Sequence, residues 1–389
     1  MTTTIADHID DLTVQDIHEA AGQLLVVGFE GATEEPPEAI AQALGDGTIG
    51  GVILFRRNVD TVEQVCALNE RVHSLAADAP EAPFVAVDQE GGRVVRLKEP
   101  LTPIPPMRAV GDSRDQRLIS EVSEVIATEV GALGFNLNFA PVLDVDTNPL
   151  NPIIGDRAFG STPESVSSAA GAFLLGHHTA GVLPCGKHFP GHGDTLLDSH
   201  LELPTLKHDM SRLDRVELEP FRRAISADIP MLMTAHMLLP ALDAEHPTTL
   251  SKAVIDDLLR EQMGYDGVVI TDDLEMQAVA ERYEIEEMVE LGLRAGVDIF
   301  LICHTEEKWQ RAHEKLVEMA ESSDEDLERL LRAAGRVRRL KRTMLGNRRR
   351  PWRRYDNWRA LLGCEEHRAI MDRVAWDPDA KRVDPTEAD

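Results

Sequence analysis

Cysteines and long apolar runs are scarce in this sequence. The four cysteines, Cys66, Cys185, Cys303 and Cys364, lie far apart and form no CxxC pair, so the spacing of neither a zinc knuckle nor a disulfide framework is present. No apolar stretch approaches the length of about 18 residues that a membrane helix needs. We therefore expect no transmembrane helix, and we expect the cysteines to be reduced residues that serve in packing.

Positive charge is also scarce. The 40 Lys and Arg residues face 68 Asp and Glu residues, which gives a formal net charge of −28, and such a charge repels phosphate backbones and anionic membranes. No Lys or Arg precedes Arg56, so the basic n-region of a secretory signal is missing. We expect a cytoplasmic protein that binds neither nucleic acid nor membranes. The sequence leaves its oligomeric state open.

The sequence does contain a repeated alternation of short apolar runs and longer amphipathic stretches. The eight apolar runs are 23–29, 51–55, 84–87, 137–142, 183–186, 231–235, 267–271 and 298–303. Apolar strands that alternate with helices indicate parallel βαβ units whose sheet is covered on both faces. Eight units are the number in a (β/α)8 TIM-type barrel, and we predict this α/β fold, with an open doubly wound sheet as the alternative.

Helical spacing of apolar residues predicts the helices between and after these strands. Their ranges are 62–75, 117–133, 165–180, 212–226 and 252–263, followed by two closing helices at 306–321 and 324–341. We divide the chain into a lead-in (1–19), one barrel domain (20–345) and a C-terminal extension (346–389). The extension is basic and aromatic at 347–358 and then acidic. We expect its basic part to dock on the protein's own acidic surface or on a second subunit, and its last dozen residues to be mobile.

Polar residues stand at or just past the C-terminal ends of five predicted strands. They are Asp88, Asp144, Lys187 with His188, His236 and Asp272. Barrel enzymes build their active sites at this end of the strands. Any one of these residues could simply cap a helix or form an ion pair, but the five positions together predict an active site.

The densest polar segment is GKHFPGHGDTLLDSH at 186–200, a Gly- and Pro-rich loop that is too polar to be mere connection. His188 and His192 with a carboxylate could hold zinc, or the histidines could satisfy backbone groups of the loop. Alternatively, Asp198 could accept a hydrogen bond from His200 and leave the other ring nitrogen to move a proton near neutral pH. The residues alone leave all three interpretations open.

A second polar segment, GYDGVVITDDLEM at 264–276, ends an apolar strand in Asp272 and Asp273. A carboxylate at a strand end can be a nucleophile, a metal ligand or a helix N-cap. We expect one of the two to face the site and the other to cap the following helix, and the pattern does not say which does which.

A third segment, VDQEGGRVVRL at 87–97, places Asp88 at a strand end. Its double glycine permits a tight turn or a close approach of backbone to a ligand. Arg93 and Arg96 supply planar donors suited to carboxylate or hydroxyl groups, although surface arginines beside a turn are the commoner explanation.

These motifs, in this order, resemble those of glycoside hydrolase family 3, and specifically its small single-barrel β-N-acetylglucosaminidase branch. The resemblance rests on VDQEGGRVVRL, FAPVLDV (139–145), GDRAFG (155–160), GKHFPGHG with DSH, and GVVITDDLEM, and it spans residues from about 20 to 345. Larger members carry a second domain that supplies a glutamate acid/base. The residues after 345 leave no room for such a domain, which favours the branch that uses a histidine.

The resemblance implies a role for each matching residue. Asp272 is the nucleophile that forms a covalent glycosyl-enzyme, His200 is the general acid/base, and Asp198 orients His200. The implied sugar-binding residues are Asp88, Arg96, Arg157, Lys187 and His188. A retaining glycosidase needs such a nucleophile and a proton donor beside the scissile bond, and no metal or cofactor is implied.

We therefore predict an exo-acting retaining β-N-acetylhexosaminidase that removes terminal β-linked GlcNAc from a small amino-sugar glycoside. The resemblance suggests fragments from peptidoglycan turnover as the natural source. The nearest alternative is a phosphorylase that passes the sugar to phosphate with the same catalytic residues. Weaker alternatives are a metal-dependent hydrolase that uses His188, His192 and Asp272, and a non-catalytic sugar-binding barrel.

Overall fold

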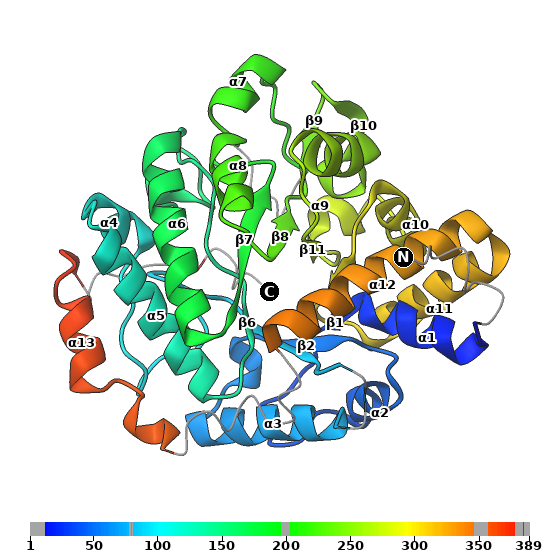
Figure 1. The fold of residues 1–389 in the computed structure, drawn as a ribbon, viewed down its shortest axis with the longest axis horizontal. Helices are drawn as coiled ribbons and strands as arrows, with labels where there is room; N and C mark the ends of the chain where they lie inside the picture. The colour runs from blue at the N-terminus through cyan, green and yellow to red at the C-terminus, as the bar shows by residue number, and fades with distance from the viewer. Residues whose placement is uncertain are drawn as a thin grey trace, which may run out of the picture.

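The computed structural model describes residues 12–77, 79, 81–195, 203–345, 357–377 and 384. Eight parallel strands form a closed barrel in the order β1-β12-β11-β8-β7-β6-β3-β2 (Figure 1). They are β1 (Leu25–Val27), β2 (Gly51–Leu54), β3 (Phe84–Val87), β6 (Leu137–Asn138), β7 (Leu183–Phe189), β8 (Met231–Thr234), β11 (Val268–Asp273) and β12 (Ile299–Ile302). Each strand falls on one of the eight predicted runs, so the TIM-type barrel is confirmed.

The barrel strands are apolar on both faces because each face packs against a different core. In β3, Phe84 and Ala86 belong to an interior cluster to which all eight strands contribute. Val85 and Val87, which alternate with them, pack into the layer between the strands and the helices. Side chains on a strand alternate between its two faces, so continuous apolar runs are what a barrel strand covered by helices requires.

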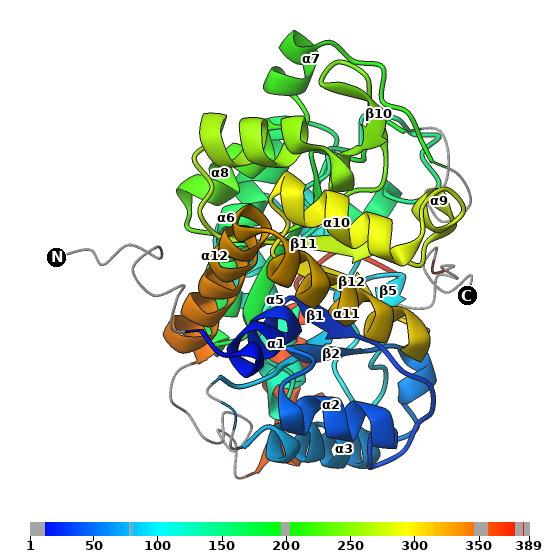
Figure 2. The same cartoon turned by 90° about the vertical axis from the view of Figure 1, so that its right-hand side faces the viewer.

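Helices surround the barrel (Figures 1 and 2). They include α1 (Val14–Gln23), α2 (Glu38–Asp46), α3 (Val62–Leu75), α4 (Met107–Asp112), α5 (Gln116–Ala132), α6 (Pro163–Ala180), α7 (Met210–Arg215), α8 (Glu219–Ser226), α9 (Gln277–Ala280), α10 (Ile285–Ala295), α11 (Glu306–Ser322), α12 (Asp324–Leu340) and α13 (Glu365–Met371). A π-helix spans Ala253–Gln262 and a second one spans Lys341–Leu345.

Two predicted helices differ from the observed ones. The helix predicted at 212–226 is divided into α7 and α8, because Val216 leaves the helical conformation and Pro220, which has no N–H to donate, opens a new first turn. The helix predicted at 252–263 is present as the π-helix at Ala253–Gln262. The other predicted helices and both closing helices are confirmed to within about two residues at each end.

The two ends of the barrel are closed by different elements. At the N-terminal ends of the strands, Val337 and Leu340 of α12 join the interior cluster. At the opposite face lie α9 and a hairpin of β4 (Gln89–Gly91) and β5 (Val94–Val95) (Figure 2). A second hairpin, of β9 (Leu238–Leu239) and β10 (Asp243–Pro247), follows β8. The face with β4 and β5 is therefore the one where a barrel active site is expected.

The described part of the C-terminal extension packs on the barrel's helices. Met371 of α13 and the neighbouring Val374 are buried in a cluster with residues of α5 and α6. Arg359 pairs with Glu63 on α3 at 3.1 Å. Of the basic segment 347–358, which was predicted to dock on acidic surface, only residues 357 and 358 are described. In the described parts of the chain, no helix is both long and apolar enough to cross a membrane.

Candidate active site

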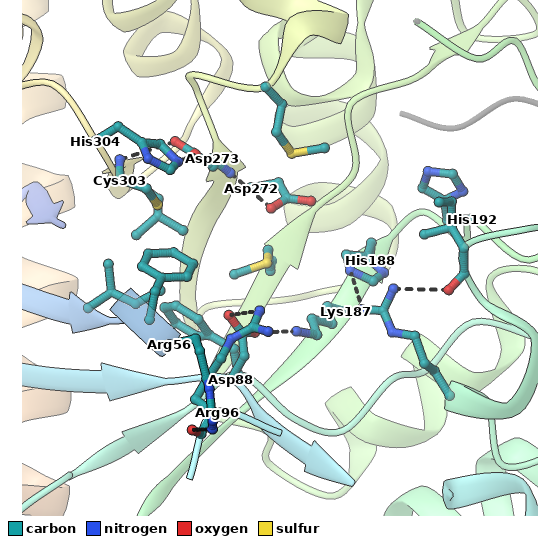
Figure 3. A pocket seen from close by; sticks show the side chains of 18 of the residues that line it. Arg56, Asp88, Arg96, Lys187, His188, His192, Asp272, Asp273, Cys303 and His304 are labelled. Atoms are coloured by element: carbon teal, nitrogen blue, oxygen red, sulfur yellow. Dashed lines mark hydrogen bonds and ion pairs between the residues drawn. The ribbon is translucent and has the colours of Figure 1, made fainter. Parts of the chain in front are cut away.

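A pocket opens at the C-terminal ends of the barrel strands (Figure 3). Its charged and histidine lining residues are Arg56, Arg57, Asp88, Arg96, Arg157, Lys187, His188, His192, Asp272, Asp273 and His304. Six of the eight predicted site residues are among them. The other two, Asp198 and His200, lie outside the described residues, so their roles stay predictions.

Buried ion pairs link one wall of the pocket. Arg157 binds Glu90 through two hydrogen bonds, with Nε 2.9 Å from Oε2 and Nη2 2.8 Å from Oε1. Lys187 Nζ lies 2.6 Å from Glu90 Oε1 and 2.6 Å from Asp88 Oδ1. At the far end, Arg96 Nη2 lies 3.7 Å from Asp88 Oδ2. Positive and negative groups thus alternate along this set of residues, which we call the ion-pair chain.

The ion-pair chain stays charged although it is buried. Burial alone would raise the pKa of Glu90, but Arg157 and Lys187 outweigh it and hold that pKa well below its ordinary value. Burial alone would likewise lower the pKa of Lys187, but Asp88 and Glu90 raise it above its ordinary value. At neutral pH the wall therefore presents fixed cationic donors and carboxylate acceptors, which suit the hydroxyl groups of a sugar.

Glu90 was not among the predicted site residues. It is only 1% exposed and makes the central contacts of the ion-pair chain. A signal for it was available, because Glu90 comes two residues after Asp88 in the same extended segment and therefore points to the same side of it. The turn after it is made by Gly91 and Gly92, both with positive φ, which confirms the predicted tight turn and returns the chain along β5 to Arg96.

Asp144 holds the loop after β7 in place. Its carboxylate lies 2.7 Å from His188 Nδ1 and accepts the backbone N–H of His192 at 2.6 Å. Burial would raise the pKa of Asp144, but the neighbouring His188 and His192 together outweigh it and the pKa is lowered. A carboxylate on Nδ1 leaves His188 Nε2 directed toward Arg157, whose Nη2 is 3.5 Å away.

Two other residues that the sequence singled out also have supporting positions. His236 bonds Thr249 Oγ1 through Nδ1 and the backbone oxygen of Asp273 through Nε2, each at 2.8 Å. Arg93 binds the carbonyl oxygen of Ile153 at 2.9 Å and forms further bonds to the same loop. These contacts fix backbone around the pocket.

The three interpretations of the loop at 186–200 can be compared with the described part of it. His192 Nδ1 lies 2.7 Å from Thr195 Oγ1, and burial lowers the pKa of His192 to about 4, so this histidine is neutral at pH 7. Among the described residues, no three His, Cys, Asp or Glu side chains are grouped as a metal ion would require. The acid/base interpretation concerns Asp198 and His200, which are not described.

Asp272 and Asp273, at the end of β11, differ in what their carboxylates contact. Asp272 projects into the pocket (Figure 3), where its Oδ1 accepts the backbone N–H of Asp273 at 2.9 Å. Asp273 Oδ1 instead accepts the backbone N–H groups of Glu275 and Cys303 at 3.0 and 3.2 Å. Both carboxylates line the pocket, and Asp273 binds loop backbone and does not cap α9, which Met276 precedes.

His304 forms the opposite rim of the pocket. Its Nε2 lies 3.4 Å from Asp273 Oδ2, and this hydrogen bond raises the pKa of His304. Phe55 stacks on its ring with centroids 6.0 Å apart, and the Arg57 guanidinium lies 4.5 Å from the centre of the Phe55 ring. The pocket thus combines carboxylates, a polar wall and an aromatic surface.

TIM-barrel enzymes have their active sites at the C-terminal ends of the strands. The charged groups at that end place this chain in the class of barrel enzymes. The chain matches the family described as glycosyl hydrolase family 3 N terminal domain over residues 16–340. It therefore belongs to glycosyl hydrolase family 3 and is a glycoside hydrolase, as the motifs predicted.

Curated relatives of this chain carry the name β-hexosaminidase. One from Thiobacillus denitrificans is 41% identical over 268 residues, covering 67% of this chain and 73% of that protein. One from Chromobacterium violaceum is 39% identical over 308 residues, covering 77% of this chain and 84% of the relative.

Solved structures of the same family superpose closely on the chain. A β-N-acetylglucosaminidase from Paenibacillus matches with a TM-score of 0.84 and 38% identity, over 93% of this chain and 68% of that one. NagZ from Neisseria gonorrhoeae, in complex with N-trifluoroacetyl-D-glucosamine, matches with a TM-score of 0.73 and 30% identity, over 90% of this chain and 98% of that one.

Proposed function

We propose that this chain is an exo-acting retaining β-N-acetylhexosaminidase that removes terminal, non-reducing β-linked GlcNAc. The observation that supports this most is the position of Asp272, which lines the same pocket as the ion-pair chain. The names of the similar proteins, β-hexosaminidase and β-N-acetylglucosaminidase, support the same substrate class. A cytoplasmic location and fragments of peptidoglycan turnover as the natural source are part of the proposal.

In the first step, Asp272 attacks the anomeric carbon and forms a covalent glycosyl-enzyme. The backbone N–H of Asp273 on Asp272 Oδ1 fixes the direction of the carboxylate. His200, oriented by Asp198, donates a proton to the departing oxygen. In the second step the same histidine takes a proton from water, which displaces Asp272 and releases GlcNAc with retained configuration.

Substrate binding falls to Asp88, Arg96, Arg157, Lys187 and His188. Asp88 accepts hydrogen bonds from sugar hydroxyl groups, while Arg96, Arg157 and Lys187 donate them and His188 donates or accepts according to its tautomer. Because each charged group already has a buried partner in the ion-pair chain, the wall keeps its geometry when the pocket is empty. Such pre-organisation lowers the cost of binding a small polar ligand.

The test is a time course on an aryl β-GlcNAc glycoside, with and without phosphate and with EDTA, in which the sugar product is identified. We expect free GlcNAc at a rate that neither phosphate nor chelator changes. GlcNAc-1-phosphate as the product would replace hydrolysis by phosphorolysis. Inhibition by EDTA would support the metal-dependent alternative, and measurable GlcNAc affinity without turnover would support a non-catalytic barrel.

A further inference from the structure

The C-terminal extension places a carboxylate on the sugar-binding wall. Asp384 Oδ2 lies 2.5 Å from Arg96 Nη1, although the two residues are 288 positions apart in the chain. The Asp384 side chain is 5% exposed and that of Arg96 is 2% exposed. Of the last dozen residues, which were expected to be mobile, the structure describes Asp384, and its carboxylate forms a buried pair with the Arg96 guanidinium.

Asp384 completes the charge balance of the ion-pair chain. Without it, the linked residues are three cations, Arg157, Lys187 and Arg96, and two carboxylates. With it, positive and negative groups alternate from one end to the other and their numbers are equal. An uncompensated charge at a buried position is costly. The 3.7 Å separation between Arg96 Nη2 and Asp88 Oδ2 is longer than the other contacts in the ion-pair chain, so Asp88 alone compensates Arg96 only weakly.

The contact reaches Arg96 at the nitrogen that Asp88 does not use. Asp88 approaches Nη2 and Asp384 approaches Nη1, so the planar guanidinium is held at both of its ends. Arg96 lines the pocket, whereas Asp384 is not among the described residues that line it. The carboxylate therefore reaches the wall of the pocket through Arg96.

We propose that Asp384 is a positioning residue of the sugar-binding site. It fixes the Arg96 guanidinium and, by compensating its charge, prevents Arg96 from drawing Asp88 away from Lys187. Asp88 then keeps the orientation in which it accepts hydrogen bonds from the sugar. This inference rests on the proposed function, in which Arg96 and Asp88 contact the substrate. Asp384 thereby belongs to the binding site, although it lies beyond the residues that match the family.

The experiment compares the full chain with Asp384→Asn and Asp384→Glu on an aryl β-GlcNAc glycoside, measuring KM, kcat and inhibition by GlcNAc. Asp372→Asn is the matched control, because it makes the same change in charge in the same extension, at a residue that is exposed. We expect Asp384→Asn to raise KM and the inhibition constant of GlcNAc about tenfold, the lower end for a lost charged hydrogen bond. We expect kcat to change less than threefold, and Asp384→Glu to recover part of the affinity.

A general loss of structure would lower kcat and the melting temperature as well, so the split between KM and kcat identifies a positioning role. KM and inhibition within twofold of the unaltered chain in Asp384→Asn would overturn the inference and leave the proposed function intact. A fall in KM would also overturn it and would instead make Asp384 an inhibitory contact. If the unaltered chain neither hydrolyses the glycoside nor binds GlcNAc, the proposed function and this inference both fail.

Discussion

Replacing Glu90 with glutamine tests whether the ion-pair chain stabilises the folded barrel. The side chain keeps its size, but it loses the negative charge that faces Arg157 and Lys187. The amide also turns an NH2 group toward donors that need an acceptor. Glu90 is 1% exposed and its carboxylate makes three contacts of 2.9 Å or less with these two cations, so water has little access to replace it.

The expected magnitude follows from this burial. Removing one partner of a buried ion pair costs about 3–5 kcal/mol, because it leaves an uncompensated charge. The unfolding entropy of about 2.1 cal/mol/K per residue gives about 0.7 kcal/mol/K for roughly 330 folded residues. The two figures together predict a melting temperature about 4–7 °C below that of the unaltered chain.

The assay is a thermal melt followed by circular dichroism, with urea denaturation at 25 °C as a second measure. Glu124→Gln is the control, because Glu124 is exposed on α5 and the same chemical change there should move the melting temperature by less than about 1 °C. A shift that small for Glu90→Gln would refute the reasoning, since it would mean that Arg157 and Lys187 are satisfied without the carboxylate.

Three further predictions concern catalysis and pH. Asp272→Ala should abolish turnover. Asp273→Ala removes contacts to the Glu275 and Cys303 N–H groups and should mainly lower the melting temperature. The reverse pattern would mean that the two residues have exchanged roles. His200→Ala should slow substrates with poor leaving groups far more than aryl glycosides, because good leaving groups need less protonation, and equal losses would make His200 structural. Burial lowers the pKa of His177 to about 3, so the unfolded chain takes up a proton at this residue first as pH falls below about 6.5. His177 should therefore contribute up to ~1.4 kcal/mol per pH unit to the fall in unfolding free energy between pH 6.5 and 4, measured by urea titrations as the difference in slope between the unaltered chain and His177→Gln. A His177→Gln variant with the same slope would contradict this last expectation.

Local sequence patterns determined the barrel and the end of it that holds the site. A strand that is covered on both faces has a continuous apolar sequence. Polar residues that follow such a run, as Asp88 and Asp272 do, lie at the same end of the barrel because the strands are parallel. These features depend on near neighbours in the chain, so they can be predicted without knowing what packs against them. The ordered motifs added the family, which similar proteins confirm.

Only the tertiary structure decided which side chains are partners. The strand pattern left Asp272 and Asp273 equivalent, and the contacts of Asp273 with loop backbone distinguish them. Glu90 was not among the predicted site residues, and its partner Arg157 lies 67 positions further along the chain. Asp384 belongs to the tail that was expected to be mobile, and its carboxylate pairs with the Arg96 guanidinium. The strength of an ion pair depends on the distance between the charges and on the exclusion of water. Both are determined only when the chain folds, so neither follows from the order of residues.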